Sequence, residues 1–355
     1  MTLAAPPPRL SVAGRSLCSF HVFGLAGFAA ACAAAGAVTD MRGLPAWPLL
    51  ALVATAVVTF LALAYATKIL AGAERLVFYH HELAVLAVSA IVLWISGLPV
   101  AAYLDAVAVG LGVFLAFGRL GCGAVGCCHG RPFRHGVTYS APHAAAGFPS
   151  PLTGVPLFPV QWVESAGAIL IVAAALWWSA QGAPAGALLR LTAAGYGVLR
   201  FALEPLRGDP DRPYWRGLSE AQWTSLALLG FALTGTAWGS AALLAAAWLA
   251  APRVSRTASP WFTPSHLHEL ASLLRSAAGP DVRTTSKGLS ISCGSLVWEG
   301  RPCRHYSISS RTAPLSTRMV RRLIRELAAL EGLDSRRWLP VQGGHGVFHI
   351  LREEA

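Results

Sequence analysis

Long apolar stretches alternate with short polar ones over the first 250 residues of the chain. A transmembrane helix needs about 20 predominantly apolar residues to cross the hydrocarbon core of a bilayer. The last of these stretches is long enough to be tilted, or to be broken near Gly235 and Gly239. The first follows Arg9 and Arg15, but it exceeds the apolar core of a signal peptide, so we interpret it as a retained helix. The pattern therefore predicts seven transmembrane helices, at residues 20–38, 47–66, 83–98, 103–117, 160–178, 185–203 and 222–250.

The pattern changes after Pro252, where a polar, proline-containing segment leads into shorter elements. We expect helices over 265–277 and 316–330, and strands over 289–298, 304–310 and 346–351. The helix over 316–330 has apolar residues on one face and arginines largely on the other, which suits packing on a small sheet better than lying on anionic lipid. The predicted fold is an all-α polytopic membrane domain (residues 1–252), a linker (253–264) and a small basic α+β domain (265–355).

Composition supports a membrane protein. Only 13% of the residues are charged, 55% are hydrophobic and the mean hydropathy is +0.53, which excludes a disordered chain and an ordinary soluble enzyme. From Arg253 onward there are 15 basic and 8 acidic residues, so most of the net charge of +11 lies in the tail. No aromatic platform or motif there indicates nucleic-acid binding. A basic tail is most simply cytoplasmic, and seven spans then place the N-terminus and the loop over 119–159 outside.

Ionisable side chains at membrane depth are costly and are usually functional. Arg190 is interpreted as a side chain that reaches the membrane surface. Arg200 and Glu204 are four residues apart on one helix face, and Arg207 follows one turn later. Together with Arg119 they indicate an anion site, because guanidinium groups match phosphate oxygens well. A phospholipid headgroup is the expected ligand.

Four short motifs occur in order between the predicted spans, with Asp105 ahead of them. The motifs are Gly118-Arg119-Leu120-Gly121-Cys122, Phe158-Pro159-Val160-Gln161-Trp162-Val163-Glu164, Tyr196-Gly197-Val198-Leu199-Arg200-Phe201-Ala202-Leu203-Glu204-Pro205-Leu206-Arg207 and Gln222-Trp223. Together they resemble the motifs of the prolipoprotein diacylglyceryl transferases, bacterial enzymes that attach a lipid to the lipobox cysteine of lipoproteins. The resemblance covers most of residues 20–250 and implies a multi-pass protein of the bacterial cytoplasmic (inner) membrane.

The resemblance also implies a reaction: an sn-1,2-diacylglyceryl group moves from phosphatidylglycerol to a cysteine thiol of a prolipoprotein, and glycerol phosphate is released. Such an alkyl transfer needs a thiolate and positive charge on the leaving phosphate, and we expect no cofactor. The expected catalytic residues are His80 as general base, with Glu82 as the alternative, and Arg119 and Arg200 as the phosphate clamp. Substrate binding is expected of Asp105, Gly118, Gly121, Gln161, Glu164, Glu204 and Arg207.

The sequence departs from the family pattern mainly in the first motif. Cys122 and Cys127 replace an asparagine and a glutamate, Val125 replaces a second asparagine, and His80-His81-Glu82 stands where the family has His-Gly-Gly. The cysteines leave several alternatives open: a Cys122–Cys127 disulfide, transient attachment of lipid to Cys127, or small residues packed under a tight glycine-rich turn. Another is a metal or thiol site made by Cys122, Cys127, Cys128 and His129.

These departures keep two rival functions open. The chain is either a divergent family member that modifies another acceptor, or a non-catalytic lipid-binding or redox-sensing membrane protein that uses the cysteine cluster. The tail lies outside the resemblance and indicates no function.

Overall fold

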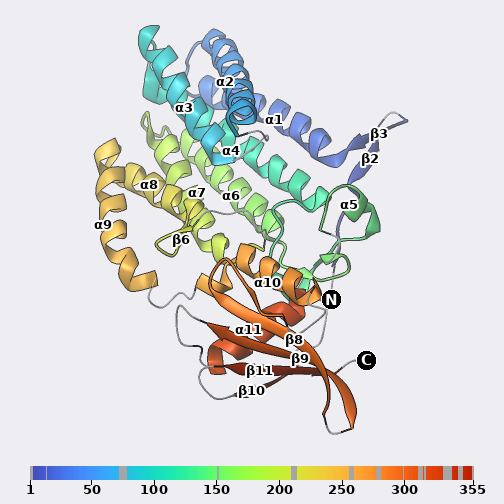
Figure 1. The fold of residues 1–355 in the computed structure, drawn as a ribbon. Coiled ribbons are helices and arrows are strands. Elements are labelled where there is room, and N and C mark those ends of the chain that lie inside the picture. Colours follow the sequence, from blue (N-terminus) through green and yellow to red (C-terminus); the bar gives the residue numbers. More distant parts are fainter. Residues whose placement is uncertain are drawn as a thin grey trace.

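The computed structural model describes residues 3–12, 14–71, 78–149, 152–208, 214–255, 260–276, 281–298, 300–310, 315, 317–330, 338–342 and 347–353. A helical bundle forms one part of the molecule, and a sheet with two helices lies against one end of it (Figure 1). The bundle helices are α1 Ser19–Met41, α2 Trp47–Ala71, α3 Phe78–Ile95, α4 Val100–Val125, α6 Val160–Ala180, α7 Ala187–Leu203, α8 Glu220–Thr234 and α9 Ala237–Ser255.

Four described helices are long and apolar enough to cross a membrane: α1, residues Trp47–Ile69 of α2, α4 and α6. Tyr79–Ile95 and Ala237–Leu249 are shorter apolar helices. The protein is therefore a mostly helical, multi-pass membrane protein. Six of the seven predicted spans coincide with α1, α2, α3, α4, α6 and α7.

Helix α4 is the central helix of the bundle and extends about two turns beyond residue 117, where the apolar pattern predicts its end. It continues to Val125, so Gly118 to Cys122 are helical, and the chain turns only beyond them, at Gly126, Cys127 and Cys128. Glycines allow this because neighbouring helices approach their backbones closely. Gly121 faces Phe20 and Phe23 of α1, and Gly123 faces the indole of Trp162 on α6.

The seventh predicted span is two helices, so the break near Gly235 and Gly239, expected as one of two alternatives, is confirmed. Gly235 ends α8 in the left-handed conformation (φ 69°), and the chain turns back into α9. The backbones of Gly230 and Gly239 are in contact, and the Ser240 hydroxyl donates to Ala227 O at 2.8 Å. Helices α8 and α9 therefore run antiparallel, and the chain returns to the end of the bundle where α8 began.

This hairpin changes the relation between the two ends of the chain. The prediction of an external N-terminus with a cytoplasmic tail rested on an odd number of spans. In the structure both regions lie at the same end of the bundle (Figure 1). The N-terminal strand β1, Leu3–Ala4, pairs in parallel with β4, Pro132–Thr138, in the loop after α4. Arg131 beside β4 donates to Phe262 O of the tail at 3.3 Å.

The tail contains the expected helices, α10 Pro264–Ser276 and α11 Thr317–Leu330, and an antiparallel sheet in the order β10–β11–β9–β8–β7. Two of its strands were not predicted, β10 Trp338–Gln342 and the two-residue β7 Arg283–Thr284. The others are β8 Leu289–Trp298, β9 Arg301–Ser310 and β11 Phe348–Glu353. Residue 346, where the last strand was predicted to begin, and linker residues 256–259 lie outside the described residues.

The tail shares one hydrophobic core with the loop after α4. Leu323 and Leu327 of α11 are buried with Ile291 and Ile308 of the sheet, while Arg321, Arg322 and Arg325 are exposed, as expected for a helix packed on a sheet. Tyr139, Phe148, Leu152 and Leu157 of the loop belong to the same core. The smaller elements are β2 Arg9–Val12, β3 Arg15–Cys18, α5 Ala141–Ala145, η2 Glu204–Leu206, β5 Tyr214–Trp215, β6 Leu218–Ser219 and η3 Pro260–Phe262.

Candidate active site

Glu164 is a fully buried carboxylate on which three arginines converge. Its oxygens lie 3.0 Å from Arg119 Nε, 3.6 Å from Arg207 Nη1 and 3.9 Å from Arg200 Nε. The Tyr196 hydroxyl donates to Glu164 Oε1 at 3.1 Å. The three arginines, together with Glu164, are called the arginine cluster below.

Three segments of chain bring the arginine cluster together. Arg119 comes from the last two turns of α4 and Glu164 from the first turns of α6. Arg200 lies in the last turn of α7 and pairs with Glu204, four residues on, at 2.6 Å. Arg207 follows the short helix η2, where a bridge to Gly130 fixes its backbone. Three guanidinium groups thus face two carboxylates in this buried network.

An apolar cavity of about 390 Å³ lies next to the arginine cluster, because Tyr196, which bonds Glu164, is one of its lining residues. It lies between α3, α4, α6, α7, α8 and α9, and its few polar lining groups include Glu82 and Tyr196. Glu82 is close enough to Arg119 and Glu164 for their charges to interact, and Tyr196 bonds Glu164 directly. A second apolar cavity, of about 230 Å³, lies between α1, α2, α3 and α4, and Leu111 lines both.

His80 is placed differently from the other predicted catalytic residues. It is exposed at the start of α3, and its Nε2 lies 2.8 Å from Glu220 Oε1 of α8. Within the described part of the chain, its contacts are with Glu220 and the ring of Tyr79, and they do not join it to the arginine cluster. The adjacent His81 is buried and stacks on Phe60.

Asp105 is also kept apart from the arginine cluster. It lies fourteen residues before Arg119 on the same helix, which is about 21 Å along the helix axis. Its carboxylate pairs with Arg42 at 2.6 Å and accepts hydrogen bonds from the backbone N–H groups of Gly186 (2.9 Å) and Leu189 (2.7 Å). Asp105 therefore caps the N-terminus of α7 from a neighbouring helix, which is a structural role.

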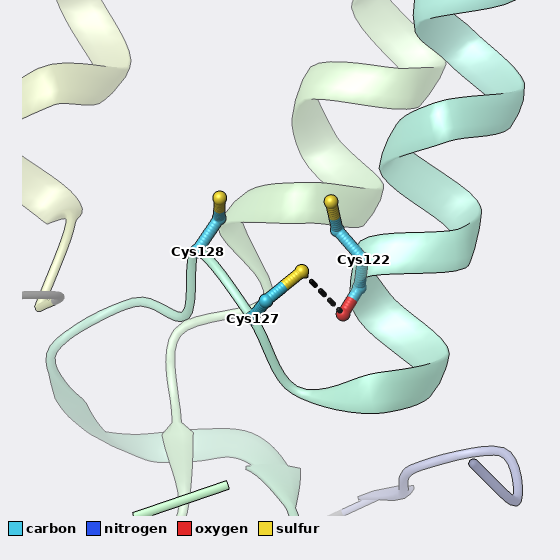
Figure 2. Close-up of side chains that lie close together, drawn as sticks. All are labelled: Cys122, Cys127 and Cys128. Carbon is cyan, nitrogen blue, oxygen red and sulfur yellow. Dashed lines mark hydrogen bonds between the residues drawn. The ribbon is translucent and has the colours of Figure 1, made fainter. Parts of the chain in front are cut away.

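Three cysteines gather where α4 ends (Figure 2). The Sγ atoms of Cys122, Cys127 and Cys128 all lie within 4.8 Å of one another, and Cys127 Sγ lies 4.0 Å from Cys122 O. Gly126 caps α4 with φ 86°, and Cys128 itself has φ 55°. Left-handed backbone is unfavourable for a cysteine, so the surrounding structure imposes it. These two residues turn the chain back over Cys122.

The cysteine group contacts Gln161 and also lies near two arginines of the arginine cluster. Gln161 of α6 donates to Cys127 O at 2.9 Å, and its amide also lies 3.3 Å from the Tyr139 hydroxyl. Hydrogen bonds with Cys122 and then Cys127, with Arg207 and Arg119 nearby, hold the pKa of Cys128 well below its ordinary value. The pKa of Cys127 is raised, chiefly through its hydrogen bond with Cys122.

The other predicted site residues, among them His129 and Gly118, do not contact the arginine cluster through any interaction described here. His129 was grouped with the cysteines, but its Nδ1 contacts Gly130 O at 3.0 Å and its ring meets Phe148. All seven cysteines are free, so the structure contains no Cys122–Cys127 disulfide. A methyl group added at Gly118 would meet no atom within 4 Å. At Gly121 a methyl group would contact α1, so glycine at this position allows the two helices to pack closely.

Three residues that matter here were not predicted from the sequence. Tyr196 precedes Arg200 by one helical turn, and that spacing was a signal for a shared face. Arg42 and Tyr139 are brought in by contacts distant in sequence, to Asp105 and Gln161, so no local pattern could have indicated them.

Comparison with known proteins fits this geometry. Residues 76–238, which carry the arginine cluster and the cysteine group, match the family model described as prolipoprotein diacylglyceryl transferase. This match covers a little under half of the chain. The predicted resemblance is therefore confirmed over this range, while the family model does not extend to the tail.

Two curated relatives are similar to part of the chain. The phosphatidylglycerol–prolipoprotein diacylglyceryl transferase of Clostridium tetani (strain Massachusetts / E88) is 34% identical over 125 residues, 35% of this chain and 47% of the relative. The phosphatidylglycerol–prolipoprotein diacylglyceryl transferase 2 of Clostridium perfringens (strain 13 / Type A) is 31% identical over 131 residues, again 35% and 47%. The chain thus spans about half the length of the curated relatives it matches.

Proposed function

We propose that this protein transfers a diacylglyceryl group from phosphatidylglycerol to a cysteine thiol of a prolipoprotein in a bacterial inner membrane. The family match over residues 76–238 supports this reaction class. The observation that carries the proposal is the arginine cluster, because three arginines around one buried carboxylate form a site for a phosphate group at membrane depth.

The two apolar cavities suit the rest of such a lipid. The larger one has Glu82 and Tyr196 among its lining residues and otherwise mostly aliphatic side chains. An acyl chain in this cavity would place the glycerol carbons and the phosphate beside Arg119 and Arg200. The second cavity shares Leu111 with the first, so the two chains of one lipid would lie on either side of α4.

The chemistry follows from this placement. The acceptor sulfur attacks the glyceryl carbon that bears the phosphate; the S–C bond forms, and the C–O bond breaks with its electron pair moving to the phosphate oxygen. Arg119, Arg200 and Arg207 stabilise the charge that develops on that oxygen. Glu204 orients Arg200 through their ion pair.

The thiol proton needs an acceptor near the reacting sulfur. Glu82 fits this role better than His80, because Glu82 lines the cavity and interacts with Arg119 and Glu164. His80 is paired with Glu220 at the edge of the bundle. Glu82 is thus the proposed general base.

The test is transfer of labelled diacylglyceryl from phosphatidylglycerol vesicles to a lipobox peptide. Matched arms use a peptide with serine in place of cysteine, and vesicles of phosphatidylethanolamine. Arg200→Ala and Arg200→Lys should lower the rate about 100- to 1000-fold, because lysine keeps the charge but lacks the planar fork. Arg190→Ala is the control, since Arg190 is an exposed arginine on the same helix.

Two results would contradict the proposal. One is equal loss of rate in Arg190→Ala and Arg200→Ala, which would assign the effect to helix α7 as a whole. The other is no transfer by folded wild-type protein from either lipid.

A further inference from the structure

The thiols of Cys122, Cys127 and Cys128 form a group that the diacylglyceryl transfer described above does not use. They share one small volume at the end of α4, with their sulfur atoms within 4.8 Å of one another (Figure 2). Three sulfur ligands of this kind suit a thiophilic cation, and zinc in particular. The described residues place no histidine or carboxylate within that group, so a fourth position would remain open.

We propose that Cys122, Cys127 and Cys128 bind one Zn²⁺ and that the open fourth position binds the acceptor thiol as a thiolate. This inference rests on the proposed function for its second part only. Zinc sites that act in catalysis keep three protein ligands and one open position, and a thiol that coordinates a metal is deprotonated.

The distances suit a zinc ion. With Zn–S bonds of about 2.3 Å in a tetrahedron, the sulfur atoms of a zinc site stand about 3.8 Å apart. The three Sγ atoms need to close by no more than about 1 Å from their present separations to reach this geometry. Cys127 and Cys128 lie beyond the end of α4, so the helix does not fix the positions of their sulfur atoms.

The backbone already favours convergence of the sulfurs. Cys128 is one of two non-glycine residues with positive φ in the described chain. Gln161 fixes the carbonyl of Cys127 from α6.

The surrounding charges also fit. Three thiolates and one Zn²⁺ carry a net charge of about −1, and Arg207 and Arg119 lie close enough to act electrostatically on Cys128. Cys122 is also one turn beyond Arg119 on α4. A thiolate in the fourth position would therefore lie beside the phosphate site that the arginine cluster forms.

The step balances without an oxidant. The acceptor thiol binds zinc and releases its proton to Glu82 or to water. Its sulfur then forms the S–C bond while the C–O bond to phosphate breaks, and the neutral thioether, a weak ligand, leaves the metal. Direct attachment of lipid to one of the three cysteines would instead give a stable thioether that cannot be passed on.

The first experiment measures zinc per chain in full-length, detergent-purified protein by elemental mass spectrometry. The wild type is compared with Cys122→Ser, Cys127→Ser and Cys128→Ser, and with Cys18→Ser as the matched control, because Cys18 lies before α1 and outside the cysteine group. We expect about one zinc in the wild type and the control. Each cluster variant should bind zinc more than about 100-fold more weakly. Loss of a ligand costs more than loss of a residue that hydrogen-bonds a ligand, which weakens binding about 10- to 100-fold.

The second experiment uses protein loaded with Co²⁺, whose visible absorption reports its ligands. A cysteine peptide should shift the spectrum, and the serine form of the same peptide should not. This binding readout needs no lipid transfer, so failure of the metal site and failure of the proposed reaction remain distinguishable.

Three results would overturn the inference. One is equal zinc content in the wild type and all three cluster variants. The second is a Cys122–Cys127 disulfide in the purified protein, with no zinc uptake after reduction. The third is a Co²⁺ spectrum that responds equally to both peptides.

Discussion

Glu164 holds together residues from several helices, because its carboxylate is the shared counter-charge of Arg119, Arg200 and Arg207. A charge that is buried and then loses its partner is strongly destabilising, whereas an exposed pair contributes little. The same carboxylate therefore supports both the fold and the proposed phosphate site. The sequence indicated Glu164 as a substrate-binding residue, but it could not show that three arginines share its carboxylate.

Replacing Glu164 tests this role. Glu164→Gln should lower the free energy of unfolding by about 3–5 kcal/mol, because three arginines lose their buried counter-charge. Glu220→Gln, at the partly exposed pair with His80, should cost less than about 1 kcal/mol. Thermal unfolding of the two variants in the same detergent makes the comparison, and equal midpoints would contradict it.

The buried His266 should make the stability of the tail depend on pH. The residue is buried, its ring nitrogens lie 2.8 Å from Trp261 O and from Thr285 Oγ1, and burial lowers its pKa. The unfolded chain, with a histidine pKa of about 6.5, then binds more protons than the folded chain below that pH. Stability should therefore fall as the pH drops below about 6.5 and continue to fall until the folded pKa is reached.

The measurement is hydrogen exchange in β8 and β9 of the full-length protein between pH 7 and pH 5, corrected for intrinsic rates. His266→Gln should have a shallower dependence, and what remains is expected from His305, whose pKa burial also lowers. Protection that is independent of pH in the wild type would disprove this explanation.

Among the helices, α4 shows where sequence patterns succeed and fail. Its apolar part was predicted, but its last two turns were not, because Gly118, Gly121 and Gly123 have low helix propensity. Close packing of α1 and of Trp162 compensates for this, and such contacts are not visible in a local pattern. The break at Gly235 was foreseen only as an alternative, since hydrophobicity alone does not distinguish a long helix from a hairpin.

Two glycines on α4 give a matched test of this packing. Gly123→Ala places a methyl group against the Trp162 indole, so it should destabilise the protein by about 1–3 kcal/mol. Gly118→Ala meets no atom within 4 Å and should change stability by no more than about 1 kcal/mol. Unfolding midpoints of both variants decide the matter, and a larger loss in Gly118→Ala would contradict the α4–α6 contact.

For the molecule as a whole, the tail and the loop after α4 form one unit at one end of the bundle. Their shared core includes Tyr139 and Phe148 of the loop with Trp261 and Leu270 of the tail. The amphipathic patterns of the tail predicted most of its helices and strands. They could not predict that the tail packs on the loop after α4, because this packing depends on contacts between segments more than 100 residues apart, such as Arg131 with Phe262.

This arrangement predicts that both ends of the chain are on the same side of the membrane. A protease site appended to each end should be cut from the same face of sealed, oriented vesicles, because β1 pairs with β4 and the tail contacts the same loop. A cytoplasmic protein fused to a known inward-facing helix controls for leakage. Cleavage of only one end would contradict this prediction, because it would show that the chain crosses the membrane an odd number of times.

Release of glycerol phosphate from phosphatidylglycerol vesicles is the measurement that tests the proposed reaction most directly. Wild-type protein should release it only when a cysteine peptide is present, with one lipid-modified peptide formed for each glycerol phosphate. Release without a thiol acceptor, or no release by folded protein that binds the lipid, would contradict the account.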